Sequence, residues 1–245
     1  MTYLFQYKKI NDYFWQQLIT SKLYCAKREE LNDPFDCYID WSSIIDKILK
    51  ENEIESLRRQ NIVEIRQGLL NWDPTINSRV GCFTNNCDTP LMWSHYADSH
   101  TGVCLAYADF TKNLNLQYPN FSSEKASFWG ASRVEYGDNA FSTWLLEGDL
   151  NAHDSVSAVG NAIIKLFTIK STPWAYEEEY RFLMHKEERI KLDETYLRQV
   201  TFGMHIDSKN EEAIREVIRN KYSKVIFSRV VKSSQNDMGI EIIEC

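Results

Sequence analysis

The chain has 245 residues, of which 43% are hydrophobic and 13% are aromatic. This content is sufficient for a substantial hydrophobic core and fits one domain over residues 1–245. The formal net charge of −7 argues against a broad electrostatic surface for nucleic acid, which needs an excess of lysine and arginine.

The cysteines and the hydropathy pattern bear on the cellular compartment. None of the six cysteines forms a Cys-x-x-Cys pair, and several lie inside apolar runs. The N-terminus shows no apolar signal segment, and no apolar stretch is long enough to span a bilayer. We therefore expect a soluble, reduced, cytoplasmic protein that acts without a membrane partner.

The first part of the chain is predicted to mix strands and helices. Expected strands cover residues 3–7, 23–26, 80–84 and 102–107, and expected helices follow Asn11 and cover residues 41–71 and 91–97. Asn11 is a suitable N-cap because its side chain accepts backbone hydrogen bonds. The helices at about 41–72 are interpreted as an insertion over the sheet. The strand at 102–107 is almost wholly apolar and is expected at the sheet centre.

The rest of the chain continues this mixed order. Residues 108–130 are polar and predict a loop, either a lid over a site or a variable surface insertion. Expected strands then cover residues 134–136, 178–184, 199–204, 224–230 and 239–243, and expected helices cover residues 156–169 and 209–222. This order predicts an α+β domain with a mixed, partly antiparallel sheet and a helical insertion.

The segment Leu-Asn-Asp-Pro-Phe-Asp at residues 31–36 predicts a turn, because Asn and Asp bond nearby backbone and proline fixes its own φ. One reading is a purely structural turn. The other is that Asn32 or Asp33 faces a ligand cleft.

The first candidate site motif is Trp93-x-His95-Tyr96-x-x-x-His100-x-Gly102. Two imidazoles, one on a helix and one in the following loop, would converge on a ligand, with His95 the candidate acid or base. Gly102 would let another backbone segment approach closely. The alternative is that both histidines are structural and bond backbone at the helix end.

The second candidate motif is Trp-Ala-Tyr-Glu-Glu-Glu-Tyr-Arg-Phe at residues 174–182. In an extended strand, Glu177, Glu179 and Arg181 share one face. Lys170 lies just upstream and would add a contact for an anion. Buried carboxylates beside a guanidinium suit proton abstraction, a polar ligand or a cationic transition state. The alternative is an edge strand with solvated charges.

A metal site is not expected. The candidate ligands are Cys82, Cys87, His95, His100 and Cys104, and their spacing is not that of a zinc finger or ribbon. The chain also lacks a glycine-rich phosphate loop, a serine nucleophile elbow and a dinucleotide-binding fingerprint.

Five segments together resemble the uncharacterised bacterial family called domain of unknown function 2971. They are LFQYKKI at 4–10, LNDPFD at 31–36, GCFT at 81–84, LMWSHYADSHTGVCL at 91–105 and WAYEEEYRF at 174–182. The chain departs from this family at Gln6 and Lys8, where the family favours Lys and Arg. The family name implies no activity.

A looser resemblance, in the order of the elements, is to the ADP-ribosyltransferase-like superfamily. It implies NAD as substrate, a protein or nucleic-acid acceptor, and a role as a bacterial toxin or phage-defence effector. Carried over to this chain, it places Gln6 or Tyr7 on NAD, Glu177 or Glu179 as the catalytic carboxylate, and Tyr96 or Trp93 against the nicotinamide.

Two alternative functions remain open at this stage. One is a nuclease that uses His95 and His100 as acid and base, for which NAD would be irrelevant. The other is a non-catalytic sensor that binds a small ligand in the same cleft and is stabilised by it without turnover.

Overall fold

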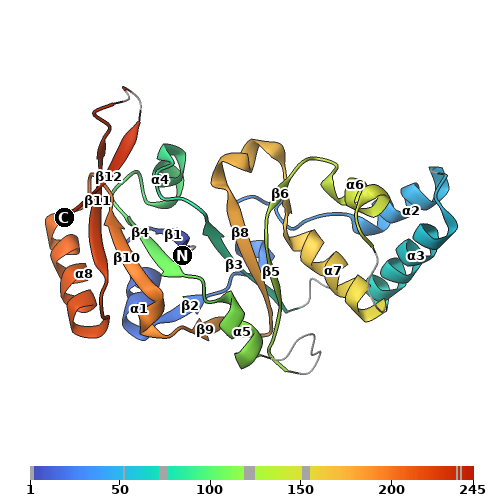
Figure 1. The fold of residues 1–245 in the computed structure, drawn as a ribbon, viewed down its shortest axis with the longest axis horizontal. Coiled ribbons are helices and arrows are strands. Elements are labelled where there is room, and N and C mark those ends of the chain that lie inside the picture. Colours follow the sequence, from blue (N-terminus) through green and yellow to red (C-terminus); the bar gives the residue numbers. More distant parts are fainter. Residues whose placement is uncertain are drawn as a thin grey trace.

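The protein is represented by a computed structural model that describes residues 3–51, 53–71, 77–118, 125–150, 155–235, 237 and 239–245. An eight-stranded sheet runs through it, in the order β12-β11-β10-β4-β1-β3-β8-β5 (Figure 1). Its strands are β1 (Tyr3–Lys8), β3 (Ser78–Thr84), β4 (Val103–Ala108), β5 (Ser127–Arg133), β8 (Glu179–His185), β10 (Leu197–Phe202), β11 (Ile226–Lys232) and β12 (Ile240–Glu244). Within this sheet, the pair β10–β11 is parallel and the other described pairs are antiparallel. The prediction of an α+β fold with a mixed sheet is confirmed.

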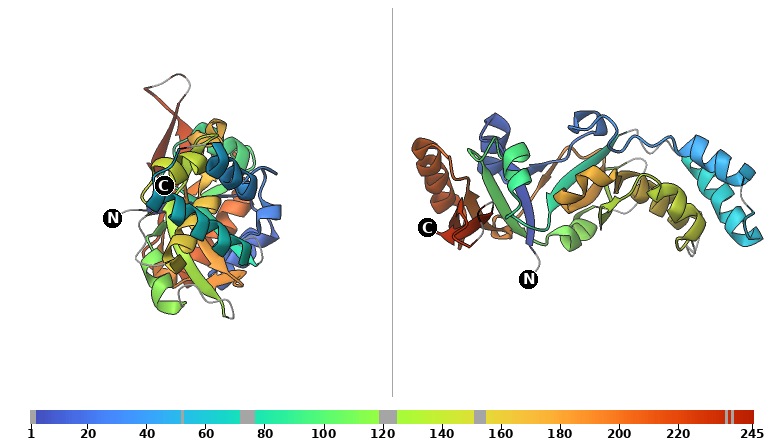
Figure 2. Two further views of the ribbon diagram at one scale, coloured as in Figure 1. Left: turned by 90° about the vertical axis from the view of Figure 1, so that its right-hand side faces the viewer. Right: turned by 90° about the horizontal axis from the view of Figure 1, so that it is seen from above.

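The helices lie along this sheet and at both of its ends (Figure 2). They are α1 (Asp12–Thr20), α2 (Trp41–Glu51), α3 (Ser56–Asn71), α4 (Pro90–Tyr96), α5 (Thr111–Gln117), α6 (Ala140–Glu147), α7 (Ser155–Phe167) and α8 (Ser208–Lys221). Two small sheets pair β2 (Lys22–Tyr24) with β9 (Arg189–Lys191), and β6 (Glu135–Tyr136) with β7 (Ile169–Lys170). Short 3-10 helices cover Arg28–Glu30, Thr172–Glu177 and Glu194–Tyr196. Across the described residues, none of the helices has the length and apolar character to cross a membrane.

Local chemistry explains several of the element boundaries. The side chain of Asn11 accepts a hydrogen bond from the backbone of Phe14 at 3.0 Å and caps α1, as its residue type predicts. Ser21 ends that helix in the left-handed conformation. All residues of β4 are buried, and β4 lies between β1 and β10, so the predicted central position is confirmed.

The predicted helical insertion corresponds to α2 and α3, and residue 72 lies outside the described residues. Ile45, Ile62 and Ile65 form a buried cluster with residues of α6 and α7. α3 packs along α7, and α7 in turn packs on β5 and β8. The helical pair therefore reaches the sheet largely through α7, whereas the sequence predicted that it lies over the sheet.

The prediction of one long loop at 108–130 is wrong. This range contains α5 and the edge strand β5, while residues 119–124 lie outside the described part. The Asp109 side chain accepts a hydrogen bond at 3.0 Å from the backbone of Thr111, the first residue of α5, and Leu114 is buried in the core. The sequence of β5 does not alternate between apolar and polar residues, because the consecutive residues Phe128 and Trp129 are both buried. Each lies in a different one of the two large core clusters. α6 was also missed.

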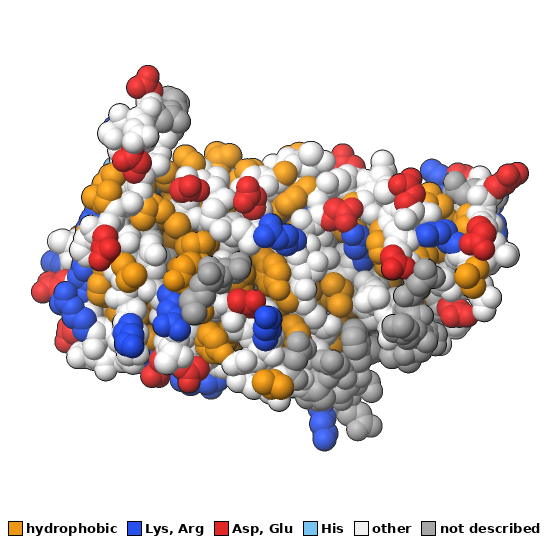
Figure 3. All heavy atoms as spheres, in the orientation of Figure 1, with side chains coloured by type: hydrophobic (Ala, Val, Ile, Leu, Met, Phe, Trp, Pro, Cys, Tyr) orange, Lys and Arg blue, Asp and Glu red, His pale blue; other side chains and the backbone are white. Residues whose placement is uncertain are grey.

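Acidic and basic side chains are interspersed on the face of the molecule seen in Figure 3. Lysine and arginine side chains do not gather into one broad patch on this face.

Gly102 is predicted to be intolerant of a side chain, because a Cβ there would lie 2.2 Å from the backbone oxygen of Lys8 and 2.9 Å from that of Ala97. We expect Gly102→Ala to lower the free energy of unfolding by about 1–3 kcal/mol, since backbone atoms cannot move aside easily. Gly137→Ala is the matched control, because its Cβ would meet its nearest neighbour at 3.7 Å. Urea denaturation of both variants checks this, and equal stabilities would contradict it.

Candidate functional site

The candidate site lies between β1 and β3, two neighbouring strands of the large sheet that share little backbone pairing. β1 pairs with β4 at six positions, but β1 pairs with β3 at a single position, Phe5 with Thr84. A cavity of about 340 Å³ is lined by residues of both strands at this junction. It is lined by Phe5, Gln6, Tyr7, Lys8, Tyr24, Ala26, Glu30, Leu31, Asn32, Asp36, Val80, Cys82, Phe83, Thr84, Met92, Tyr96, Lys170, Glu177, Glu179 and Arg181.

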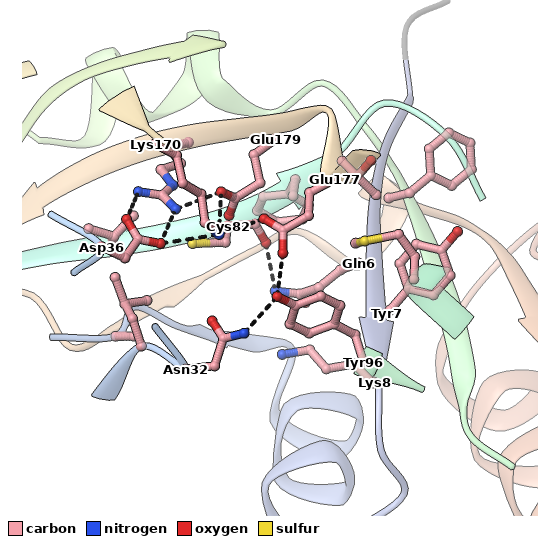
Figure 4. Close-up of a pocket in the computed structure, with 18 of the residues that line it drawn as sticks. Gln6, Tyr7, Lys8, Asn32, Asp36, Cys82, Tyr96, Lys170, Glu177 and Glu179 are labelled. Atoms are coloured by element: carbon pink, nitrogen blue, oxygen red, sulfur yellow. Dashed lines mark hydrogen bonds and ion pairs between the residues drawn. The ribbon is translucent and has the colours of Figure 1, made fainter. Parts of the chain in front are cut away.

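A buried ion pair between Arg181 and Asp36 lines the cavity, and Figure 4 shows Asp36 close to Lys170. Arg181 is fully buried, and its two terminal nitrogens donate to the two carboxylate oxygens of Asp36 at 2.7 and 2.6 Å. The same guanidinium donates to Glu179 Oε2 at 2.6 Å and to the backbone oxygen of Phe167 at 3.0 Å. Burial alone would raise the pKa of Asp36, but the hydrogen bonds and charge of Arg181 outweigh it and lower that pKa.

Lys170 connects the carboxylates of the cavity. Its ammonium lies 2.5 Å from Glu177 Oε2, 3.2 Å from Asp36 Oδ2 and 3.4 Å from Glu179 Oε2. Burial would lower the pKa of Lys170, but the three carboxylates raise it overall, so the lysine stays charged. β7 holds Lys170 in place by its parallel pairing with β6.

Glu177 is the carboxylate with the properties of an acid or base. Burial raises its pKa, the charge of Glu179 adds to this, and Lys170 opposes it. Tyr96 donates a hydrogen bond to Glu177 Oε1, and Asn32 donates to the Tyr96 hydroxyl at 2.8 Å. A carboxyl group that is held in one orientation and resists ionisation suits proton transfer near neutral pH.

The predicted convergence of the two glutamates and the arginine is confirmed, although by a different route. Glu179 and Arg181 lie on one face of β8, as alternation requires. Glu177 ends a 3-10 helix, and Glu178 follows it in the left-handed conformation. β8 lies between β3 and β5 in the sheet, so the edge-strand alternative is wrong.

The first strand contributes Gln6 and Tyr7, as predicted. Gln6 donates to the Cys82 carbonyl at 3.4 Å and accepts from Gln17 at 2.9 Å, so its amide is largely committed to the protein. Tyr7 packs edge-on against Trp93, with ring centroids 5.1 Å apart. Trp93 is fully buried and donates to the Cys87 carbonyl, so it supports the cavity wall without lining it.

The two predicted site histidines lie apart from this cavity and have different neighbours. His95 is exposed and hydrogen-bonds Tyr176 at 3.0 Å. His100 stacks on Trp93 and lies near His205. Burial, with a smaller effect of His205, lowers the pKa of His100. His100 thus packs on Trp93 and does not line the cavity.

The turn at residues 31–36 serves both purposes that the sequence left open. Asp33 accepts a hydrogen bond from the Phe35 backbone at 2.9 Å and stabilises the turn, and it does not line the cavity. Asn32 and Asp36 do line it. The sequence analysis did not identify Asp36 as a site residue. It could have done so from the need for carboxylate partners, because a buried arginine and a buried lysine both require them.

A metal ion has no evident site: across the ranges that the structure describes, no three His, Cys, Asp or Glu side chains are grouped to hold one. The candidate ligand Cys82 lines the cavity, whereas Cys104 is buried in the core.

Removing one side of the buried ion pair tests the architecture of the site. Asp36→Asn is expected to lower the free energy of unfolding by about 3–5 kcal/mol, because Arg181 stays charged, buried and partly unpaired. Asp138→Asn, at an exposed position, is the control and should change stability by less than about 0.5 kcal/mol. Urea denaturation midpoints measure both, and a neutral Asp36→Asn would mean that the pair is not structural.

Residues 92–182 match the model of a family described as "Protein of unknown function (DUF2971)". Searches of curated proteins and of solved structures found no match. The matched segment runs from α4 to the middle of β8, so it contributes Tyr96, Lys170, Glu177 and Glu179 to the cavity. The resemblance predicted from the motifs is therefore confirmed over this segment, which is similar to the DUF2971 family.

Proposed function

We propose that the chain is an enzyme of the ADP-ribosyltransferase type, which cleaves the bond between nicotinamide and ribose in NAD. The observation that carries this proposal is the pair Glu177 and Glu179 at one cavity wall, held by Lys170 and Arg181. A preorganised carboxylate in a site that excludes water stabilises positive charge that develops in the transition state.

The steps of the proposed reaction are those that create and then remove this positive charge on the ribose. The carbon–nitrogen bond breaks, nicotinamide leaves with the bonding electron pair, and positive charge develops on the ribose. Glu179 accepts from Arg181 and Lys170 through Oε2, which leaves Oε1 to face this charge. Glu177 then accepts the proton of the attacking acceptor hydroxyl or water, a role that suits its raised pKa. The acceptor, a protein or nucleic acid, ends with the ADP-ribosyl group.

The cavity fits part of NAD. Its volume of about 340 Å³ lies near the lower end of the 300–1,000 Å³ typical of ligand sites, so the nicotinamide riboside half would enter and the adenosine half would extend outward. Tyr96 lines the cavity and would contact the nicotinamide, whereas the fully buried Trp93 would not. Gln6 and Tyr7 would contact NAD from the opposite wall.

The same cavity supports one alternative, a small-ligand sensor without turnover. The nuclease alternative gains no support from this cavity, because neither His95 nor His100 lines it and the two have different neighbours.

Nicotinamide release from NAD tests the proposal. We expect Glu177→Gln and Glu179→Gln each to slow release by at least about 100-fold, the usual contribution of a positioned acid, base or electrostatic group. Glu178→Gln is the matched control, because this glutamate lies between the other two in sequence but is exposed. It should retain the rate of the unmodified chain.

Two results would contradict this function. One is release that persists in both glutamine variants. The other is a thermal shift with NAD but no release, with or without candidate acceptors, which would favour the sensor.

A further inference from the structure

Lys8 is a positively charged residue that lines the cavity, and it has no role in the proposed reaction. It ends β1, shares a strand face with Gln6, and is partly buried. It lines the cavity with Tyr96 and Asn32, and Figure 4 shows it across the cavity from Glu179.

Its charge is not matched by the protein. Lys170 and Arg181 are paired with carboxylates at 2.5–3.4 Å, but among the described residues no carboxylate oxygen lies within 4.0 Å of the Lys8 ammonium. Figure 4 likewise draws no interaction to Lys8. The ionisable groups that act on it are the thiols of the buried Cys25 and the half-buried Cys82.

An unpaired, partly buried ammonium is unfavourable. Burial lowers the pKa of Lys8 to about 8, which means that the folded state opposes its charge. Buried charges are normally paired, so a cation that faces a cavity without a partner is suited to an anion that arrives from solution.

We propose that Lys8 is the phosphate-binding residue of this cavity and that it holds a phosphate group of a nucleotide ligand. The inference rests on the proposed function for the identity of that nucleotide as NAD, but not for the binding of phosphate itself.

The distribution of charge within the cavity supports this assignment. Glu177, Glu179 and Asp36 surround Lys170 and Arg181 on one side, so a phosphate placed there would meet carboxylates. On the β1 side, Lys8 is accompanied by the neutral side chains of Asn32 and Tyr96. The Tyr96 hydroxyl donates to Glu177, and the other lining carboxylate, Glu30, accepts hydrogen bonds from the Tyr24 hydroxyl and the Lys27 backbone. Among the described residues, Lys8 is thus the cation on this side without a carboxylate partner. A ligand with a sugar toward β8 and a phosphate toward β1 therefore matches the cavity.

Binding measurements with Lys8→Met and Lys9→Met test the assignment. Methionine keeps the length of the side chain and removes the charge. Lys9 is exposed, and its nearest carboxylate oxygen, on Asp98, lies 4.0 Å away, so Lys9→Met is the matched control. The probes are inorganic pyrophosphate, ADP-ribose and adenosine, each titrated by calorimetry into the full chain.

We expect Lys8→Met to weaken ADP-ribose binding by about 10-fold or more, as loss of a charge-assisted hydrogen bond does, and to abolish the pyrophosphate response. Adenosine binding should be unchanged. Lys8→Met should also raise Tm by about 2–4 °C, because the unpaired charge no longer has to be buried. Lys9→Met should behave as the unmodified chain throughout.

The outcomes separate this inference from the proposed function. Lys8-dependent pyrophosphate binding without NAD cleavage supports the phosphate site and contradicts the transferase. NAD cleavage with an unchanged KM in Lys8→Met supports the transferase and overturns the phosphate site. The phosphate site is also overturned if the unmodified chain binds neither pyrophosphate nor ADP-ribose. A Tm that falls in Lys8→Met, with phosphate binding retained, assigns Lys8 a structural role instead.

Discussion

The ion pair between Arg181 and Asp36 is the constraint on which the site depends. Arg181 occupies the interior of β8 and is fully buried, so its charge has to be matched inside the protein. Asp36 does this with two hydrogen bonds, and it thereby fixes the 31–36 turn against the sheet. That turn presents Asn32, which in turn orients Tyr96. One buried guanidinium thus links a loop, a strand and a helix that are distant in the sequence.

The helices at the far end of the molecule contribute to the same site indirectly. α3 packs along α7, and the carbonyl of Phe167, the last residue of α7, accepts a hydrogen bond from Arg181. The chain then enters β7 and delivers Lys170 to the carboxylates. The helical insertion therefore has a physical role in the site, because it stabilises the helix from which Lys170 and the Phe167 carbonyl are positioned.

A buried ion pair of this kind adds little to the stability of a protein. When such a pair is replaced by apolar side chains of similar volume, the protein is often equally stable or more stable. The cavity nevertheless gathers Asp36, Glu177 and Glu179 around two cations, raises the pKa of Glu177, and leaves Lys8 without a partner. Unfavourable arrangements of buried charge and shifted pKa values are concentrated at sites that bind a ligand or catalyse a reaction. This is the reason to regard the junction of β1 and β3 as a functional site.

The sequence by itself determined the local features: the caps, the apolar central strand, the close approach at Gly102 and the class of fold. It also identified Glu177, Glu179, Arg181 and Lys170, because charges inside an aromatic, apolar motif need partners. Only the tertiary structure decided which distant groups are those partners. Asp36 and Lys8 read as ordinary turn and strand residues, and they became site residues through the weak β1–β3 junction and the position of α7, which no local pattern encodes. The two histidines do not line this cavity for the same reason, since sequence proximity does not decide which face a side chain occupies.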